Sequence, residues 1–211
     1  MGRVTRATIL SRNLFVNQMF PRNYDMSKRA AAAAQTRRRI VDATLELHAE
    51  RGIAATRWDD IAARAGVGVG TVYRHFPSLD ELIPACGEAA KEVIAFPEAP
   101  PVFDGLRARA ERIERLVREV FAVYERGAPV LRTILEEAEA HPRVAQDAAA
   151  IEASLSALVD TALEPLDVTP RARAVTRAMV DLGTWQALRG QGLSSREAVE
   201  TVSRMLTGFR A

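Results

Sequence analysis

The spacing of apolar residues predicts helices along most of the chain. From Gln35 on, apolar side chains recur at steps of three and four residues, and the helix-favouring residues Ala, Leu, Arg and Glu dominate. No segment shows the strict alternation of apolar and polar residues that is typical of a half-buried strand. The pattern therefore predicts an all-α fold.

The front of the chain shows short predicted helices separated by turns. A helix from Gln35 ends at Gly52, and residues 56–59 have the form of a capping box that opens a second helix. Gly66 to Gly68 form a turn, and a short third helix follows from Val69 to Phe76. A second capping box at residues 78–81 opens a helix that Pro84 should kink.

The back of the chain follows a Pro-rich break at residues 96–101 and shows longer amphipathic helices. One apolar stripe runs from Leu106 to Tyr124 and is expected to close at Gly127. The remaining expected helices are a short one from Pro129 to before Pro142, one along the stripe from Val144 to Ala162, one from Pro170 to Gly190 with Thr169 as its N-cap, and one to Phe209 behind a capping box at residues 194–197.

Composition excludes several protein classes. The chain has 211 residues and one cysteine, Cys86, so an internal disulfide is impossible, and no Cys or His lies at metal-ligand spacing from it. No apolar run approaches the length of a membrane span. We expect a soluble cytoplasmic protein with no metal, no cofactor and no membrane partner.

The charge is unevenly distributed. Residues 1–81 hold 13 Lys or Arg against eight Asp or Glu, whereas the whole chain has a net charge of only +2. A basic front on a mildly acidic back is typical of a chain whose front alone meets phosphate.

Residues 1–34 form a basic extension that we expect to be disordered. Residues 1–25 carry four arginines and a single acid, Asp25, and lack helical periodicity. They are interpreted either as a transit-like or DNA-contacting tail or, with Met26 as the true start, as a stretch outside the native protein.

The segment from Val69 to Phe76 carries the functional argument. Val72 and Phe76 lie four residues apart and should face inward, against Ile61 and Ile40. Two short helices joined by a tight glycine turn form the outline of a helix-turn-helix, whose second helix can lie in the major groove of DNA. The residues left facing outward, which hold hydroxyl, imidazole and guanidinium donors suited to DNA, are Val69, Gly70, Thr71, Tyr73, Arg74 and His75.

This segment resembles the tetracycline-repressor (TetR) family of bacterial regulators. The matching residues run from Arg39 to Leu82 and are Arg39 to Ala43, Leu47, Arg51-Gly52, Thr56, Asp60 to Ala62, Ala65 to Val67, Gly70 to Ser78, and Glu81-Leu82. The resemblance implies an N-terminal three-helix DNA-binding domain at residues 35–80 and a helical ligand-binding and dimerisation domain at residues 81–211. It also implies phosphate contacts from Thr56, Thr71, Tyr73 and His75, and a nucleoid-associated homodimer on a palindromic operator.

Three positions depart from the family pattern. Gly68 replaces the usual serine, Val69 stands where a lysine is common, and Leu79 occupies the place of a phosphate-binding lysine. DNA affinity should then depend more on the arginines at positions 37, 38, 39, 57 and 74, with Arg37, Arg38 and Arg39 as a candidate arm near the minor groove or as a solvated helix start. We expect a shallow salt dependence of binding, near the low end of about six to ten phosphate contacts per dimer.

The back half offers candidates for a small-molecule effector site. Aromatic or polarizable side chains with a few polar groups are typical of such a pocket, and the candidates are Phe121, Tyr124, His141, Met179 and Trp185. The two last predicted helices are the candidates for a two-fold interface.

Two other protein classes compete with a regulator. An enzyme would need a nucleophile with a base, or a metal cluster, and the three histidines show no matching partner motif. The glycines at 66, 68 and 70 lack the preceding strand and the Gly-Lys-Ser/Thr of a phosphate loop. The second alternative is a helical protein-interaction module without DNA binding. We therefore predict a repressor that a small molecule releases from its operator, and no catalytic residue.

Overall fold

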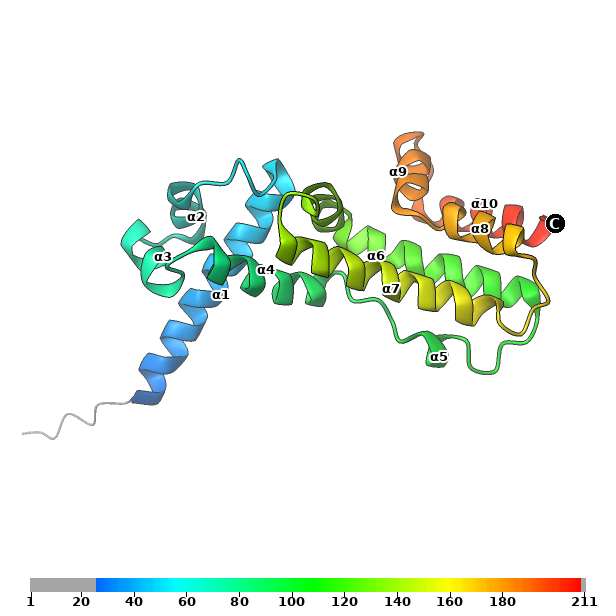
Figure 1. Ribbon diagram of the computed structural model, residues 1–211, viewed down its shortest axis with the longest axis horizontal. Coiled ribbons are helices and arrows are strands. Elements are labelled where there is room, and N and C mark those ends of the chain that lie inside the picture. The colour runs from blue at the N-terminus through cyan, green and yellow to red at the C-terminus, as the bar shows by residue number, and fades with distance from the viewer. Residues whose placement is uncertain (1–25, 210–211) are drawn as a thin grey trace, which may run out of the picture. The chain divides into compact units, whose positions relative to one another are not determined.

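The computed structural model describes residues 26–209, which form helices joined by short connections and no strand (Figure 1). The helices are α1 (Met26–Arg51), α2 (Trp58–Ala65), α3 (Val69–His75), α4 (Leu79–Val93), α5 (Ala99–Val102), α6 (Arg109–Glu137), α7 (Pro142–Leu163), α8 (Pro170–Met179), α9 (Leu182–Gly190) and α10 (Ser195–Gly208). The all-α prediction is confirmed over these residues. Within the same range, no helix is both long and apolar enough to cross a bilayer.

Helix α1 spans two parts of the chain, one ending at Thr36 and one beginning at Arg37, and each is described by itself. In the first part, residues 26–36 are helical, and the Thr36 hydroxyl donates to the carbonyl of Ala32 at 2.9 Å. We expected residues 1–34 to be disordered, and for residues 26–34 this is wrong because the alanine run from Ala30 to Ala34 has the highest helix propensity and extends α1 toward its N-terminus. Residues 1–25 lie outside the described residues.

A small core holds α1 to α4 together, and residues 37–89 are called the head from here on. Ile40, Ile61, Val72 and Phe76 are each at most 2% exposed and belong to this core. Leu82, Cys86 and Ala89 of α4 complete it. The predicted inward face of the short third helix is thereby confirmed.

A larger core joins α6, α7, α9 and α10 with the end of α4, and residues 90–209 are called the body. Figure 1 shows α6 and α7 side by side, and the buried residues of both belong to this core. Ala90 and Ile94 at the end of α4 also belong to it, so α4 contributes to the cores of both head and body. The last residues of α4 thus link the two cores.

Helix α6 corrects the predicted break at Gly127. It runs without interruption from Arg109 through Gly127 and Pro129 to Glu137. Gly127 is buried, and a Cβ there would lie 2.3 Å from Cγ2 of Ile94, so the glycine permits the close approach of α4 to α6 rather than ending a helix.

The chain between Pro170 and Gly190 also differs from the prediction of one helix. Val180 leaves the helical conformation after α8, and Asp181 caps α9 by accepting from the amide of Gly183 at 2.9 Å. A short polar residue can thus open a new helix within an otherwise helical pattern.

Two of the four predicted helix caps are confirmed and two are wrong. Thr169 accepts from Ala172, and Ser194 with Glu197 forms a complete capping box. The Ser78 side chain makes no cap hydrogen bond at the start of α4. The N-cap of α2 is Arg57, because the Thr56 hydroxyl donates back to the Gly52 carbonyl at 2.8 Å.

Candidate nucleic-acid interface

The turn between α2 and α3 has the geometry that a helix-turn-helix requires. Gly66 adopts a left-handed conformation with φ of +64°, which residues other than glycine rarely adopt. The amide of Val67 donates to the Ala62 carbonyl at 3.0 Å, so the last carbonyls of α2 are satisfied as the chain reverses. Helix α3 then starts at Val69, where its position is fixed by the buried Val72 and Phe76.

The opposite side of α3 is open. Gly70, Tyr73 and Arg74 are exposed, and a Cβ at position 70 would meet no atom within 4 Å. Thr71 and His75 are half-buried. Val69 was expected to face outward, but it is half-buried and packs against the head core because the start of α3 lies close to α2. The donors predicted on this side are therefore accessible, and the close approach of a second molecule is unobstructed at Gly70.

An aromatic contact holds the most exposed ring of this surface. Tyr73 is 46% exposed and stacks on Trp58, the first residue of α2, with ring centroids 5.0 Å apart. The contact limits the rotamers of Tyr73, and its hydroxyl is presented with little conformational freedom. Trp58 was not predicted as part of the site, because no sequence signal relates it to Tyr73 on a different helix.

Two arginines of α1 hold the ends of the other head helices. The Arg37 guanidinium lies 4.0 Å from the centroid of the Phe76 ring, and its Nη1 donates to the His75 carbonyl at 2.9 Å. Arg39 donates through Nη2 to the carbonyls of Ala65 and Gly66. Each cation therefore lies at the C-terminus of a helix, where the backbone dipole is negative.

The remaining arginines of the head divide into paired and unpaired groups. Arg38 bonds to Asp42 at 2.8 Å and Glu92 at 3.0 Å, and Arg64 bonds to Glu46 at 3.1 Å and Glu50 at 2.9 Å. The hydrogen bond from Arg64 lowers the pKa of the Glu50 carboxyl. Arg51 pairs with Asp60 at 3.1 Å.

Arg57 and Arg74 are exposed, and their side chains make no hydrogen bond or ion pair with the residues that the structure describes. Arg57 lies at the N-cap of α2, and Arg74 lies in the last turn of α3. Their guanidinium groups are available to an external anion.

His75 adds a neutral donor to this surface. Burial and the nearby charges of Arg74 and Arg37 lower the pKa of the His75 imidazole below its ordinary value. The ring is therefore uncharged near neutral pH and carries one N–H donor. His75 can contribute a hydrogen bond to a phosphate, and the net positive charge comes from the arginines.

The predicted effector residues do not surround one cavity. Phe121, Tyr124 and Trp185 form an aromatic cluster, with the Tyr124 centroid 6.1 Å from Phe121 and 6.0 Å from Trp185. The Tyr124 hydroxyl donates to the Val180 carbonyl at 2.9 Å, and burial raises its pKa. Met179 packs against the same core.

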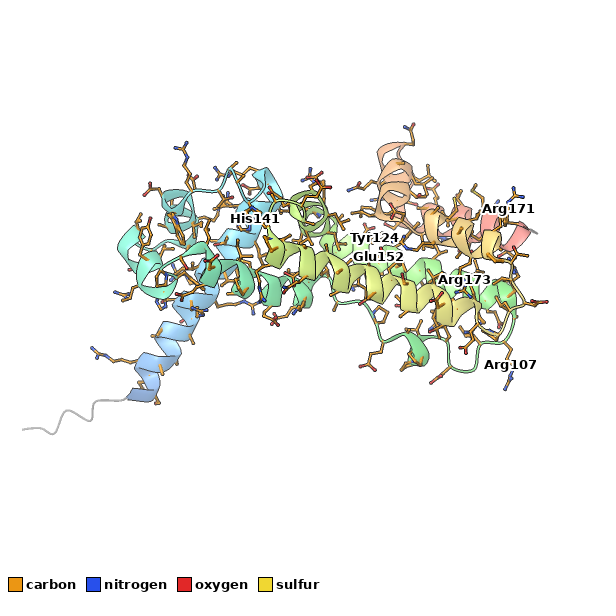
Figure 2. The ribbon with its side chains drawn as sticks, viewed as in Figure 1. Arg107, Tyr124, His141, Glu152, Arg171 and Arg173 are labelled. Carbon is orange, nitrogen blue, oxygen red and sulfur yellow. The ribbon has the colours of Figure 1, made fainter. Side chains whose placement is uncertain are left out.

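His141 lies apart from this cluster. It is the N-cap of α7, and Figure 2 shows it well apart from Tyr124 of α6. Its Nε2 is 3.7 Å from Oε2 of Glu137. Phe121 of the predicted set lines an open groove between α6 and α10.

Two cavities that the sequence did not indicate lie between α4, α6 and α7. One of about 40 Å³ is lined by His48, Cys86, Thr133 and apolar side chains. The second, of about 200 Å³, shares Gly87, Ala90, Ile134 and Asp147 with the first. Helices α1, α4, α6 and α7 supply these walls, so the periodicity of any one helix could not reveal them.

The structure thus defines a class of protein. A buried anchor on one side of α3, an open donor surface on the other and a tight left-handed turn before it are the features of a helix-turn-helix DNA-binding head.

Comparison with known proteins supports this class and names a family. Residues 40–86 match the family model described as bacterial regulatory proteins, tetR family. A segment of 58 residues is 45% identical to the HTH-type transcriptional regulator SrpR of Pseudomonas putida, and it covers 28% of this chain and only 27% of SrpR. The HTH-type transcriptional repressor KstR of Rhodococcus jostii is 26% identical over 185 residues, which cover 84% of this chain and 85% of KstR.

The similarity extends to the fold of the body. The crystal structure of the TetR-like regulator LfrR from Mycobacterium smegmatis in complex with proflavine superposes with a TM-score of 0.55 at 24% identity, and the match covers 85% of this chain and 98% of LfrR. At this identity the likeness concerns the fold. The head thus matches the family model of tetR-type bacterial regulatory proteins, and the relatives that it matches are named as transcriptional regulators.

Proposed function

We propose that this protein is a homodimeric transcriptional repressor that binds a palindromic operator and leaves it when a small molecule binds the body. The observation that carries the proposal is the open face of α3, with Tyr73 held by Trp58 and with Arg74 unpaired. Hydroxyl and guanidinium donors on such a helix can contact phosphates and base edges in the major groove.

The predicted DNA-contacting residues fall into two groups, those with exposed, unpaired side chains and those whose side chains bond within the chain. Arg57, Tyr73 and Arg74 are placed as direct contacts because their side chains are exposed. Gly70, Thr71 and His75 lie on α3 with Tyr73 and Arg74, and we include them in the DNA-binding surface. Val69 is the first residue of α3 and is half-buried. We assign Arg37, Arg38 and Arg39 to positioning the head helices, since each bonds within the chain.

Thr56 has a narrower role in this proposal. Its hydroxyl donates to the Gly52 carbonyl, so the oxygen can only accept a further hydrogen bond. A phosphate oxygen is itself an acceptor, and the Thr56 amide already donates to the Ile53 carbonyl at 3.1 Å, so we propose that Thr56 shapes the turn before α2 rather than donating to a phosphate.

Regulation by a ligand is supported by the links between head and body. Thr133 of α6 donates to the His48 carbonyl at 3.0 Å, and Glu137 accepts from the Ile53 amide at 3.0 Å. A shift of α6 would therefore act on the end of α1 and the start of the head turn. LfrR has been crystallised with proflavine, which supports a small-molecule effector as the controlling signal.

A gel shift tests the proposal. The full chain should retard DNA from upstream of its own gene at low salt, and Arg74→Ala should weaken the shift at least about tenfold while leaving the circular dichroism spectrum unchanged. Glu81→Gln, at an exposed position at the start of α4, is the matched control and should leave binding within about twofold. No retardation of any DNA by the folded wild type would instead favour the helical interaction module, and an Arg74→Ala variant that bound normally would remove α3 from the interface.

A further inference from the structure

The two cavities between α4, α6 and α7 share one charged side chain, Asp147 of α7. The smaller cavity, of about 40 Å³, and the larger one, of about 200 Å³, adjoin because four residues line both. The walls are otherwise dominated by apolar side chains of α4, α6 and α7, among them Ile83, Ile134 and Ile151, and α1 adds Leu45 and Ala49 to the smaller cavity. We call this pair of cavities the α4–α7 cleft.

The Asp147 carboxylate has no hydrogen-bond donor in the cleft, and its charge acts on Lys91, whose pKa is raised first by the hydrogen bond to Glu88 and also by Asp147. Asp147 is half-buried, and its carboxylate makes no hydrogen bond or ion pair with any residue between 26 and 209. A carboxylate partly withdrawn from water and unpaired is costly, and it gains from any cation brought to it.

Gly87 of α4 makes room for this carboxylate. A Cβ at position 87 would lie 2.6 Å from Oδ2 of Asp147, closer than any side chain permits. Gly87 is helical with no left-handed backbone, so the turn geometry does not require glycine there. The carboxylate therefore lies directly over the surface of α4 at the junction of the two cavities.

The other polar groups of the cleft leave its charge negative. Lys91 lines the larger cavity and interacts with Asp147, but its ammonium bonds to Glu88 at 2.6 Å. Arg143 at the start of α7 bonds to Gln146 and does not line either cavity. His48 lines the smaller cavity, and burial lowers the pKa of its imidazole to about 4, so the ring is neutral at physiological pH. Asp147 remains as the unbalanced charge among apolar walls.

We propose that the α4–α7 cleft is the effector site and that its ligand is a small amphipathic cation, an amine whose charged end pairs with Asp147 and whose apolar body lies among the isoleucines. This inference rests on the proposed function, because it names the class of the releasing ligand. The cleft is small, so the ligand is of about the size of a single ring with a short chain. Such a ligand contacts α4 and α6 together, which are the helices that link body and head.

A charge series of otherwise similar ligands tests the class. The probes are 3-phenylpropylammonium, 3-phenylpropan-1-ol and 3-phenylpropanoate, titrated calorimetrically into the full chain. The cation should bind best, and Asp147→Asn should weaken it about tenfold, or about 1.4 kcal/mol, while leaving the alcohol within about twofold. Asp104→Asn, an exposed aspartate in the loop after α5, is the control of equal charge change and should leave all three affinities unchanged.

A second variant acts on the same point from the opposite helix. Gly87→Ala should displace the Asp147 carboxylate and lower the affinity for the cation more than for the alcohol. Equal binding of the three probes, preference for the carboxylate, no cation binding at millimolar concentration, or a normal cation affinity in folded Asp147→Asn would each overturn the proposal.

The gel shift separates this inference from the proposed function. Wild-type protein that retards operator DNA and is released by the cation, but not by the alcohol, supports both. Retardation that the cation does not affect overturns the proposal that the cleft is the effector site and is consistent with the proposed repressor function. Cation binding by a chain that binds no DNA supports a cation site in the cleft. It overturns the proposed repressor function, and with it the role of the cleft as an effector site.

Discussion

Replacing Arg39 and Arg74 in turn should separate the residues that build the head from those that touch DNA. Arg39 donates to two carbonyls at the end of α2, whereas Arg74 has no hydrogen bond or ion pair among the described residues. We therefore expect Arg39→Ala to lower stability and leave the salt dependence of DNA binding unchanged, and Arg74→Ala to do the reverse.

The size of the stability effect follows from the Arg39 contacts. A hydrogen bond from a charged donor contributes about 1.5–3 kcal/mol when buried. The Arg39 side chain is exposed, so solvent screening reduces this, and we expect a loss of about 1.5 kcal/mol for both bonds together. For a chain of this length the loss corresponds to a fall of roughly 3–6 °C in Tm. Arg74→Ala should change Tm by less than about 1 °C.

The salt dependence of DNA binding should change for Arg74→Ala and not for Arg39→Ala. Each phosphate contact contributes about 0.9 to the slope of log K against log salt, so losing one contact per subunit lowers the slope by about 1.8 for the dimer. Arg74→Ala should show this decrease, and Arg39→Ala should keep the wild-type slope at temperatures where it is folded. The assays are thermal denaturation and fluorescence anisotropy of labelled operator between 50 and 200 mM salt. A reduced slope with unchanged stability for Arg39→Ala would refute the assignment of Arg39 to a positioning role.

Three further predictions concern stability. Burial lowers the pKa of His48 from its ordinary 6.5 to about 4, so the unfolded chain takes up a proton at a higher pH than the folded one. The free energy of unfolding should therefore fall by about 2–4 kcal/mol as pH drops from 6.5 to 4. His48→Gln should lessen this fall in urea titrations at several pH values. Gly127→Ala should cost about 1–3 kcal/mol because its methyl group meets Ile94, whereas Gly190→Ala, in open space, should be neutral or slightly stabilising, and a Tm loss shared by both would contradict the packing argument. Ser194→Ala should cost about 1 kcal/mol and Ser78→Ala clearly less, because only Ser194 makes a cap hydrogen bond; equal losses of Tm would show that the two caps are equivalent.

The sequence predicted the head well because its signals are local. The inward Val72 and Phe76, the left-handed Gly66 and the caps at Thr169 and Ser194 each follow from residues within one or two helical turns. Thr56 shows the limit of such reasoning, since its hydroxyl donates backward to the Gly52 carbonyl and its oxygen does not accept from an amide of the first turn of α2.

The body was predicted less well because its decisive contacts join distant segments. Gly127 reads as a helix end in the sequence, but it is required by Ile94 of another helix. The α4–α7 cleft depends on Asp147 facing Gly87, which no periodicity relates. Three of the predicted effector residues, Phe121, Tyr124 and Trp185, form an aromatic cluster in the core, because large rings most readily fill a core.

The arginines at 37 to 39 illustrate a third limit. A run of cations before a helix-turn-helix suggests DNA contact, and their charges are still close to the surface that we propose for DNA. The structure shows that all three have acceptors within the chain, the carbonyls at the ends of α2 and α3 and two carboxylates. Charge patterning alone does not distinguish a helix-end contact from a phosphate contact.

Methylation protection of guanine N7 on the operator tests the central claim most directly, because this atom lies in the major groove. If α3 enters that groove from each subunit of a dimer, the wild type should protect two tracts whose centres lie about 10 base pairs, or a multiple of that spacing, apart. Protection should weaken in both tracts for Arg74→Ala. Unprotected guanines at a bound operator, or a single unpaired tract, would contradict the placement of α3 in the major groove.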